Sequence, residues 1–325
     1  MTAIMITGGA GYIGSHVCKA VAAAGYTPVT FDDLSRGHAE AVRWGPLVVG
    51  NISDGTALDD AFRNHQIAGI IHLAAFAYVG ESVSNPGLYY RNNVCGTLSL
   101  MEAAHRAGGL PMVFSSTCAT YGIPHRVPID ESMPQNPINP YGRTKLHIEQ
   151  MLADFETAHQ QRWTALRYFN AAGADPDGET GEVHDPEPHV IPLAIAAAVS
   201  GGSMGVFGTD YPTPDGTAVR DYIHVSDLAA AHVLALKRLL GGGVSLAVNL
   251  GTGRGWSVRE VLDTVGKVVG RPIKVIEQAR RAGDPPVLIA DNRLAMEALG
   301  WRPELVELED IVVTAVRWHA RAFSQ

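Results

Sequence analysis

The chain has 325 residues, 46% of them hydrophobic, and a formal net charge of -8. This length supplies a large buried core, in one big domain or two moderate ones. The acidic balance, without long runs of like charge, argues against a nucleic-acid surface or a polybasic membrane patch. The first apolar run, Ala3–Ile6, is too short for a signal peptide, and no later run is long enough to span a membrane. Three cysteines without a CxxC pair argue against a disulfide framework, so we expect a cytoplasmic protein.

The first half of the chain alternates short β-branched runs with longer helical patterns. Strands are expected at Ala3–Ile6, Val29–Phe31, Leu47–Val49, Ile70–Leu73, Met112–Ser115 and Thr164–Tyr168. Helices are expected at Ile13–Ala24, Gly55–Asn64, Leu88–Arg106 and Pro140–His159. This alternation predicts an α/β fold in which residues 1–169 form a doubly wound parallel Rossmann sheet.

Beyond residue 169 the pattern changes. A segment rich in Gly, Pro, Asp and Glu reads as loop, and helices mixed with short strands follow it. The helices are expected at Ile191–Ser200, Ser226–Leu240, Val258–Val269, Asn292–Leu299 and Glu309–Ala320. We expect residues 170–325 to form a smaller mixed α/β lobe, with some segments, such as Val248–Leu250, returning to the main sheet.

A glycine-rich turn follows the first expected strand and opens the first expected helix, where residues 7–16 read TGGAGYIGSH. Gly8 permits a tight turn, Gly11 lets the backbone approach a pyrophosphate, and Gly14 lets helix and strand pack closely. The helix N-terminus supplies unpaired N–H groups and a partial positive charge for the phosphates. The turn therefore predicts a dinucleotide site.

The end of the second strand indicates which dinucleotide is bound. Asp32 stands where a carboxylate bonds the adenosine ribose hydroxyls and repels a 2′-phosphate, which favours NAD over NADP. Arg36 is close enough in sequence to pair with such a phosphate instead, so NADP stays open as the alternative.

A tyrosine and a lysine stand one helical turn apart in the segment NPYGRTK, residues 139–145. Its proline suits the first helical position and its asparagine the cap, so Tyr141 and Lys145 share one face. An ammonium near a phenol lowers the phenol pKa, and a charged nicotinamide ring adds to this effect. The pair predicts a base for a sugar hydroxyl, and Thr117, which follows an expected strand, offers a hydroxyl to orient the reacting oxygen.

Seven segments in the same order resemble the UDP-glucose 4-epimerase family over essentially the whole chain. They read TGGAGYIGSH (Thr7–His16), HLAAFAYVGESV (His72–Val83), NNVCGT (Asn92–Thr97), FSSTCATYG (Phe114–Gly122), NPYGRTK (Asn139–Lys145), LRYFNAAGADPDGE (Leu166–Glu179) and DGTAVRDYIHVSDLA (Asp215–Ala229). The resemblance implies a homodimer that keeps NAD bound and interconverts UDP-glucose and UDP-galactose. It does so by reversible C4 hydride transfer through a 4-keto sugar, which the C-terminal lobe would bind.

The resemblance also implies individual roles. Tyr141 is expected to act as base and then as acid, Lys145 as its electrostatic partner, and Thr117 as the hydroxyl that bonds O4. The residues expected against NAD are Gly8, Gly11, Tyr12, Ile13, Gly14, Asp32, Asn51, Ile52, Leu73, Ala74, Ala75, Asn92, Tyr141, Lys145 and Phe169. The residues expected to contact the UDP-sugar are Thr117, Tyr141, Asn170, His189, Val190, Phe207, Arg220, Tyr222, Arg281 and Asp284.

Several positions depart from the family pattern. Asn51 stands where many members have aspartate, Ala77 where some have lysine, and His189 where some have an asparagine that contacts substrate. An amide oxygen can still accept the adenine hydrogen bond, so Asn51 is expected to weaken cofactor binding at most. The remaining histidines show no metal-ligand spacing, and no metal is expected.

The exact reaction leaves alternatives open. Cys118 and Ala119 stand where dehydratases and decarboxylases of similar fold carry carboxylates, which favours simple hydride removal and return. Leu288 is intermediate in size at a position that limits room beside the sugar C2 group, so N-acetylated sugars stay open. Other UDP-sugars (UDP-glucuronate or UDP-xylose), a nucleotide-sugar ketoreductase and a non-catalytic NAD-binding protein are the alternatives, although retention of Tyr141 and Lys145 argues against the last.

Overall fold

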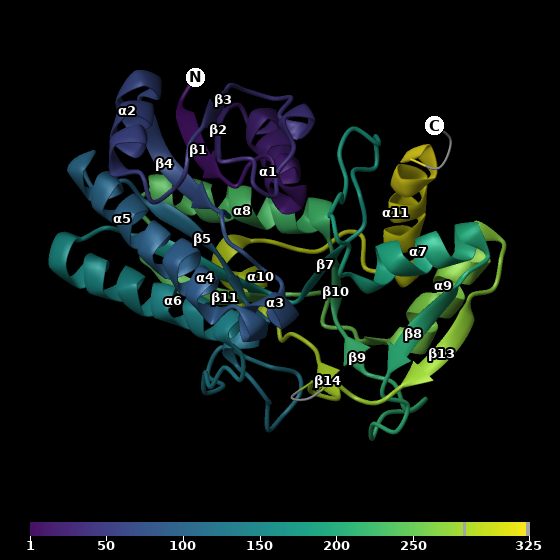
Figure 1. The fold of residues 1–325 in the computed structure, drawn as a ribbon. Coiled ribbons are helices and arrows are strands. Elements are labelled where there is room, and N and C mark those ends of the chain that lie inside the picture. The colour runs from purple at the N-terminus through teal and green to yellow at the C-terminus, as the bar shows by residue number, and fades with distance from the viewer. Residues whose placement is uncertain (282–283, 323–325) are drawn as a thin grey trace.

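The computed structural model describes residues 1–281 and 284–322 (Figure 1). Its main sheet has seven parallel strands in the order β11-β6-β5-β4-β1-β2-β3. Their bounds are β1 Ala3–Thr7, β2 Thr27–Asp32, β3 Leu47–Val49, β4 Ile67–His72, β5 Met112–Thr117, β6 Trp163–Tyr168 and β11 Leu246–Leu250. The predicted doubly wound α/β sheet is confirmed, and the Val248–Leu250 segment does return to it as β11.

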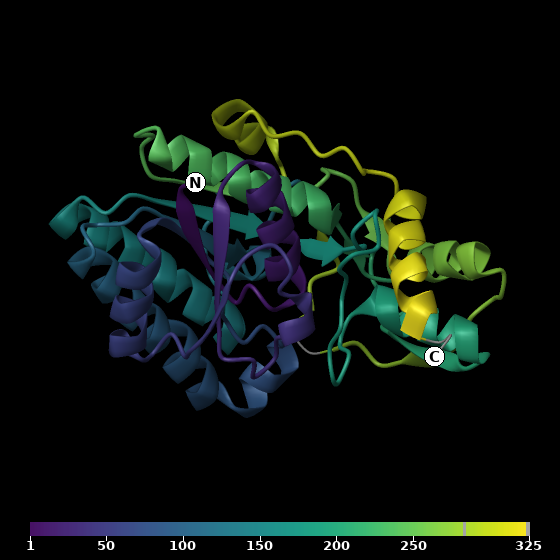
Figure 2. The same ribbon diagram turned by 90° about the horizontal axis from the view of Figure 1, so that it is seen from above.

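Helices cover both faces of this sheet (Figures 1 and 2). One face is covered by α1 Tyr12–Ala23 and α8 Val225–Leu240, and the other by α2 Gly55–His65, α5 Gly96–Arg106 and α6 Pro140–His159. Strand β1 contributes side chains to the apolar cores on both faces of the sheet, because its side chains alternate between these faces. Ile4 and Ile6 join the core beneath α1 and α8, whereas Met5 joins the core beneath α2, α5 and α6. A strand buried on both faces is apolar at successive positions, as β1 is.

The elements after β6, apart from α8, β11 and α10, form a second group at the right of Figure 1. Its helices are α7 Val190–Ser200, α9 Val258–Val269 and α11 Leu308–Ala322, which share an apolar core that includes Ile191, Val261 and Val312. Its strands are β7 Asn170–Ala172, β8 Ser203–Phe207, β9 Val219–Arg220, β10 Tyr222–His224, β12 Trp256–Ser257, β13 Lys274–Gln278 and β14 Val287–Leu288. They pair as β10-β7, β12-β9-β14 and β13-β8. The boundary between residues 169 and 170 stays a prediction.

The segment expected as one helix from Leu88 to Arg106 is divided. Helix α4 Pro86–Tyr89 leads into a wider π-helical turn, η2 Tyr90–Cys95, before α5 begins. Such turns hold an extra residue and are frequent at functional sites. Here η2 carries Asn93, whose side chain donates to the Phe76 carbonyl oxygen at 3.0 Å and to the Thr144 hydroxyl at 3.2 Å. The turn thereby ties the loop after β4 to α6.

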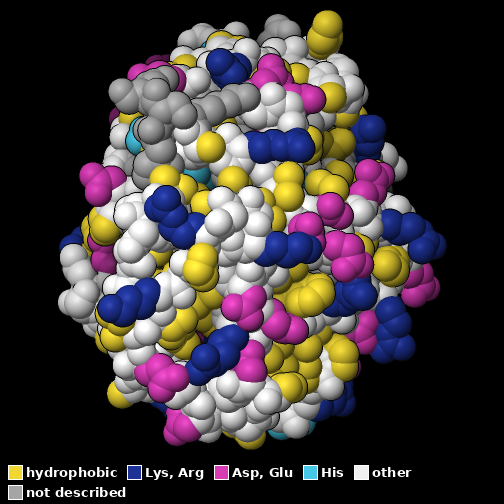
Figure 3. All heavy atoms as spheres, turned by 90° about the vertical axis from the view of Figure 1, so that its right-hand side faces the viewer, with side chains coloured by type: hydrophobic (Ala, Val, Ile, Leu, Met, Phe, Trp, Pro, Cys, Tyr) yellow, Lys and Arg dark blue, Asp and Glu magenta, His cyan; other side chains and the backbone are white. Residues whose placement is uncertain are grey.

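The short elements complete the fold: η1 Ala39–Ala41, α3 Val79–Ser84, η3 Cys118–Thr120 and α10 Arg293–Leu299. On the face shown in Figure 3, positive and negative side chains are interspersed with apolar ones, and neither sign gathers in one large patch. Within residues 1–281 and 284–322, no helix has both the length and the apolar character needed to cross a bilayer.

Candidate active site

The expected cofactor and catalytic residues follow the carboxyl ends of the parallel strands, and these ends meet at one edge of the sheet. Strands β1 and β4 are neighbours there, and the chain order reverses between them. Ligands of doubly wound sheets bind at this kind of switch point. The loops after the two strands are joined directly, because the Leu73 amide donates to the Thr7 carbonyl oxygen at 3.0 Å.

The glycine turn after β1 is packed so tightly that two of its positions leave no room for a side chain. Gly8 has a φ of +73°, and a Cβ there would lie 2.7 Å from the Ala74 nitrogen. A Cβ on Gly14 would lie 2.0 Å from the Gly8 carbonyl oxygen. Glycine at these two positions is therefore required by the turn and by the helix–strand contact.

Gly11 differs from these two glycines, because a Cβ there would meet only the Gly8 carbonyl oxygen, at an ordinary 3.4 Å. The packing of the chain therefore does not require glycine at this position. Gly11 caps the N-terminus of α1, and no side chain fills the capping role. An uncapped helix N-terminus with a bare backbone in front of it fits a diphosphate, as the sequence predicts. The residues present thus fit NAD.

Asp32 ends β2 at the same edge. Its carboxylate accepts hydrogen bonds from the Ala10 amide at 3.0 Å and from the Leu34 amide at 2.9 Å. Burial raises the pKa of this carboxyl group, while these amide hydrogen bonds oppose the rise. The two hydrogen bonds hold the carboxylate against the glycine turn, where the ribose contact is expected.

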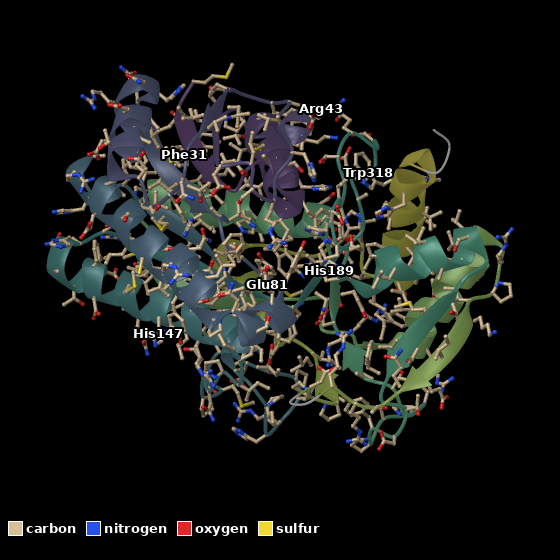
Figure 4. All side chains as sticks on the ribbon, viewed as in Figure 1. Phe31, Arg43, Glu81, His147, His189 and Trp318 are labelled. Carbon is tan, nitrogen blue, oxygen red and sulfur yellow. The ribbon has the colours of Figure 1, made fainter. Side chains whose placement is uncertain are left out.

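Arg36, the residue that kept NADP as an alternative cofactor, interacts with other side chains of the protein. Its guanidinium lies 2.8 Å from the Glu81 carboxylate and stacks over the rings of Phe76 and Tyr78 at 5.4 and 5.0 Å. Glu81 is labelled near the middle of Figure 4. A phosphate would have to compete with this carboxylate for the guanidinium, which favours NAD.

Apart from Tyr12 and Ile13, which begin α1, the other residues expected beside the dinucleotide are distributed over four loops and turns. Asn51 and Ile52 follow β3, the Leu73–Ala75 segment follows β4, Asn92 lies in η2, and Phe169 follows β6. The Asn51 amide donates to the Asp33 carboxylate at 2.7 Å, so this residue is linked to the end of β2. Phe169 is buried, and its amide donates to the Leu250 carbonyl oxygen at 3.3 Å.

The Tyr141–Lys145 pair lies at the start of α6. The helix begins at Pro140, and the Asn139 side chain accepts a hydrogen bond from the Gly142 amide at 2.8 Å, as the sequence predicts for a capped N-terminus. Tyr141 is 9% exposed and Lys145 only 2%. The Lys145 nitrogen lies 5.9 Å from the centre of the Tyr141 ring.

The protonation of this pair differs from the simple expectation. Burial lowers the pKa of Lys145 to about 7, against the opposing charge of Glu149. Burial also raises the pKa of Tyr141 above its usual value, while a hydrogen bond with Thr117 acts in the other direction. The expected lowering by Lys145 is therefore not found in the chain alone, because desolvation of the phenolate is the largest effect on the pKa of Tyr141.

Thr117 ends β5 and is 7% exposed. Its hydroxyl oxygen accepts a hydrogen bond from the Ala119 amide at 3.1 Å, which caps η3. This contact orients the hydroxyl, which lies close enough to Tyr141 to act on the pKa of its phenol. The structure thus brings the three expected catalytic side chains to one place.

Sequence reasoning missed the network behind Lys145. One helical turn further along α6, Glu149 accepts hydrogen bonds from the Ser116 hydroxyl at 2.5 Å and from the Arg167 guanidinium at 3.0 Å. Arg167 also donates to the hydroxyl of Tyr121 at 2.9 Å. The four-residue spacing of Lys145 and Glu149 on one helix was the available sequence signal.

The residues expected at the sugar nucleotide come from the second group of elements. Asn170 in β7 lies opposite Tyr222 in β10. Asp221, between β9 and β10, was missed by sequence reasoning. Its buried carboxylate accepts hydrogen bonds from the amides of Thr252 at 2.8 Å, Gly253 at 3.0 Å and Ala290 at 3.1 Å. Asp221 thereby fixes the junction of β9 and β10 to the loop after β11 and to the segment after β14.

The two expected diphosphate arginines have different surroundings. Arg220 forms an ion pair with Asp284, and one of its nitrogens donates to the Val219 carbonyl oxygen at 2.8 Å. The guanidinium of Arg281 stacks over the ring of Phe207 at 4.0 Å. Each pairing holds an arginine beside another residue expected at the substrate.

His189 and Val190 stand at the start of α7. The His189 imidazole is turned to two carboxylates, with its Nδ1 atom 2.5 Å from Glu182 and 3.0 Å from Glu187. Burial alone would lower the pKa of His189, but pairing with these carboxylates raises it to about 10. The side chain is thus committed to a local cluster.

Comparison with known proteins agrees with this geometry. Residues 4–251 match the NAD dependent epimerase/dehydratase family. The UDP-glucose 4-epimerase of Rhizobium leguminosarum bv. trifolii is 54% identical over 321 residues, which cover 98% of each chain. The crystal structure of UDP-glucose 4-epimerase from Brucella ovis in complex with NAD is 54% identical, with a TM-score of 0.95 and 98% of both chains covered.

A more distant structure is similar over the full length of both chains. It is the UDP-glucose-4-epimerase from Stenotrophomonas maltophila with bound NAD and formylated UDP-arabinopyranose, which is 36% identical with a TM-score of 0.95 and 100% of both chains covered. Fold, site geometry and full-length similarity therefore agree, and the chain belongs to the UDP-glucose 4-epimerase family, an NAD-dependent branch of the NAD dependent epimerase/dehydratase family.

Proposed function

We propose that this protein interconverts UDP-glucose and UDP-galactose by inverting C4 of the sugar. The observation that carries the proposal is the convergence of Tyr141, Lys145 and Thr117 at the carboxyl edge of the sheet, which also holds the glycine turn. The similar proteins of Rhizobium leguminosarum and Brucella ovis are named for this activity, as UDP-glucose 4-epimerases.

The cofactor would be held by the glycine turn, by the N-terminus of α1 and by Asp32. The remaining expected contacts, from the loops after β3, β4 and β6 and from η2, would enclose it. When bound, NAD accepts the C4 hydride of the sugar and later returns it.

Tyr141 is the proposed acid–base group of the reaction. It removes the proton of the C4 hydroxyl as the hydride leaves, which gives a 4-keto sugar, and it returns this proton after the sugar presents its other face. Thr117, whose hydroxyl already pairs with Tyr141, bonds O4 and fixes its position. Positive charge on Lys145 and on the nicotinamide ring offsets the burial that disfavours the phenolate.

The second group of elements supplies the proposed contacts to the UDP part. Arg220 and Arg281 suit the diphosphate, because a planar guanidinium bonds two oxygens at once. Tyr222 and Phe207 supply apolar rings for the uracil. The further proposed contacts are Asn170, His189, Val190 and Asp284, with the His189 imidazole shared with its carboxylate partners.

We also propose that the protein is a homodimer and that it is located in the cytoplasm. We further propose that it is divided into an NAD-binding domain of residues 1–169 and a nucleotide-sugar lobe of residues 170–325. The absence of disulfides among Cys18, Cys95 and Cys118 is consistent with a reducing compartment. Light scattering of the purified protein at several concentrations tests the dimer.

The test of the function is a panel of UDP-sugars without added NAD: hexose, N-acetylhexosamine, uronate and pentose. Inversion of C4 in the hexose, followed by proton NMR, is the expected result, with NAD released when the protein is denatured. Preference for another sugar of the panel would assign the alternative substrate. If turnover instead required a nicotinamide cofactor to be added, with one molecule consumed per turnover, the protein would be a ketoreductase and the proposal would be overturned.

A further inference from the structure

The segment before α7 brings two glutamates and two histidines together. They are Glu182, His184, Glu187 and His189, and one side-chain donor atom from each lies within 4.8 Å of the others. The sequence predicts no metal at this place, because the spacing E-x-H-x-x-E-x-H matches no familiar pattern. The structure nevertheless gathers four donor atoms from eight successive residues.

The donor atoms alternate between carboxylate and imidazole. Oε1 of Glu182 lies 3.1 Å from Nδ1 of His184 and 2.5 Å from Nδ1 of His189. The carboxylate of Glu187 lies 3.6 Å from the first imidazole nitrogen and 3.0 Å from the second. Four ligands at about 2.0–2.2 Å from a tetrahedral ion are separated by roughly 3.4 Å, which lies within this range.

Two of these atoms are buried within ion-pair distance of each other but make no hydrogen bond of acceptable geometry to any residue that the structure describes. The Glu182 side chain is only 5% exposed. Its Oε1 atom and the Nδ1 atom of His184 are both shielded from solvent, and neither makes a hydrogen bond of acceptable geometry to a described residue. Buried polar atoms without partners are costly, and a cation between the four side chains would satisfy both.

The cluster also differs from the acidic cluster next to it. Asp175, Asp177 and Glu179 surround the ammonium group of Lys19, which lies 2.7–2.8 Å from each of them. Over residues 1–281 and 284–322, neither Glu182 nor Glu187 pairs with a lysine or an arginine. Among the described residues, their ion-pair partners are His184 and His189.

We infer that Glu182, His184, Glu187 and His189 bind one divalent transition-metal ion, with Zn²⁺ as the best match. Two imidazole nitrogens and two carboxylate oxygens suit zinc in a tetrahedral arrangement. All four ligands come from the protein through one atom each, so no coordination position is left open for a substrate, and the proposed contact of His189 with the sugar nucleotide would use its other ring nitrogen. The site is therefore structural rather than catalytic.

The position of the cluster shows what the ion would hold together. The His184 ring meets the edges of the rings of Tyr12, at the start of α1, and Tyr78, with centroids 6.3 and 5.8 Å apart. Trp318 of α11 donates to the Glu182 carbonyl oxygen at 3.0 Å. Figure 4 labels His189 and Trp318, which both lie to the right of the main sheet in that view. The ion would join the segment between α1 and α11 to the start of α7.

The experiment titrates the full-length protein, freed of metal by a chelator, with Zn²⁺ by calorimetry and with Co²⁺ by visible absorption. We expect one ion per chain, a raised melting temperature with Zn²⁺, and a Co²⁺ spectrum typical of a tetrahedral site. Glu187→Gln and His184→Gln should each weaken binding at least tenfold. Asp177→Asn, a matched change in the neighbouring cluster, should leave binding unchanged.

The result that would overturn the inference is the absence of saturable binding by the unchanged protein, which requires no variant to fold. Equal affinity in Glu187→Gln and His184→Gln, with folding checked by circular dichroism, would also overturn it. Either result would leave the four side chains as an internal ion-pair cluster. None of these measurements uses catalytic activity, so the outcome is independent of the proposed reaction.

Discussion

The side-chain nitrogen of Lys145 donates a hydrogen bond to the backbone carbonyl oxygen of Ser115, 2.7 Å away. This bond joins the first turns of α6 to β5, two residues before the strand ends at Thr117. It also keeps a titratable amine in a site that is almost closed to water. The loss of stability caused by burying this amine and the role of the amine in catalysis can be measured separately.

Replacing Lys145 with methionine should abolish activity and stabilise the NAD-free protein. Because burial lowers the pKa of Lys145 to about 7, the unfolded chain binds this proton more readily than the folded one up to about pH 10.4. The destabilisation is full below about pH 7 and fades as the pH rises towards the unfolded value. The gain in melting temperature should therefore be larger near pH 6 than near pH 10.

Lys237→Met on α8 is the matched control for this change, because Lys237 is exposed. It should alter the melting temperature little at either pH. An equal gain for Lys145→Met near both pH values would show that burial does not perturb the amine.

Alanine at two glycines of the same turn should have different effects. Gly14→Ala forces a Cβ to 2.0 Å from the Gly8 carbonyl oxygen and should cost stability by about 1–3 kcal/mol or more. Gly11→Ala meets nothing closer than 3.4 Å, so the fold should survive while the affinity for NAD falls at least about tenfold. Thermal melting and NAD titration of both stripped variants separate the two. Unchanged NAD affinity in Gly11→Ala would show that the diphosphate does not lie against Gly11.

Thr117→Val should lower kcat by about 10²-fold with little change in KM, because it removes a hydroxyl that acts on the reacting oxygen. Thr117→Ser keeps the hydroxyl and should retain most of the activity. Steady-state kinetics with UDP-galactose make the comparison. Equal losses in the two variants would point to a packing role for the methyl group instead.

Arg281→Ala should raise KM for the UDP-sugar by about tenfold or more, since a bidentate contact to the diphosphate is lost. Its sequence neighbour is a matched control, because Arg280 pairs with Asp210 at 2.6 Å and stacks over Tyr211 at 4.3 Å. Arg280→Ala removes the same charge from the protein and should change KM less than about twofold. Similar KM values for the two variants would argue against a specific role for Arg281.

Much of the fold could be predicted because its parallel strands are short, apolar runs and its helices are periodic. The α6 bounds Pro140–His159 were predicted without error, since a cap and a proline mark the start. The division of the Leu88–Arg106 segment was not predicted. A π-helical turn depends on the distant partners of Asn93, which periodicity does not reveal.

The site could be predicted in part for the same reason. Motif residues such as Tyr141 and Lys145 are close in sequence, so local helix geometry brings them together. By contrast, β7 and β10 are only three residues long and about fifty residues apart, and their pairing places Asn170 opposite Tyr222. The balance between burial and charge at Tyr141 also depends on the folded surroundings, so the sequence motif alone does not reveal that burial raises the pKa of this phenol in the chain without NAD.

The activity of Tyr141→Phe, measured beside its NAD content, shows whether the phenol of Tyr141 moves the proton. Phenylalanine keeps the ring that packs in this buried site and removes only the oxygen that moves the proton. We predict that kcat for C4 inversion of UDP-galactose falls by about 10³-fold or more, while NAD is still recovered from the denatured variant. Near-normal turnover by Tyr141→Phe with NAD bound would show that Tyr141 is not the acid–base group of the reaction.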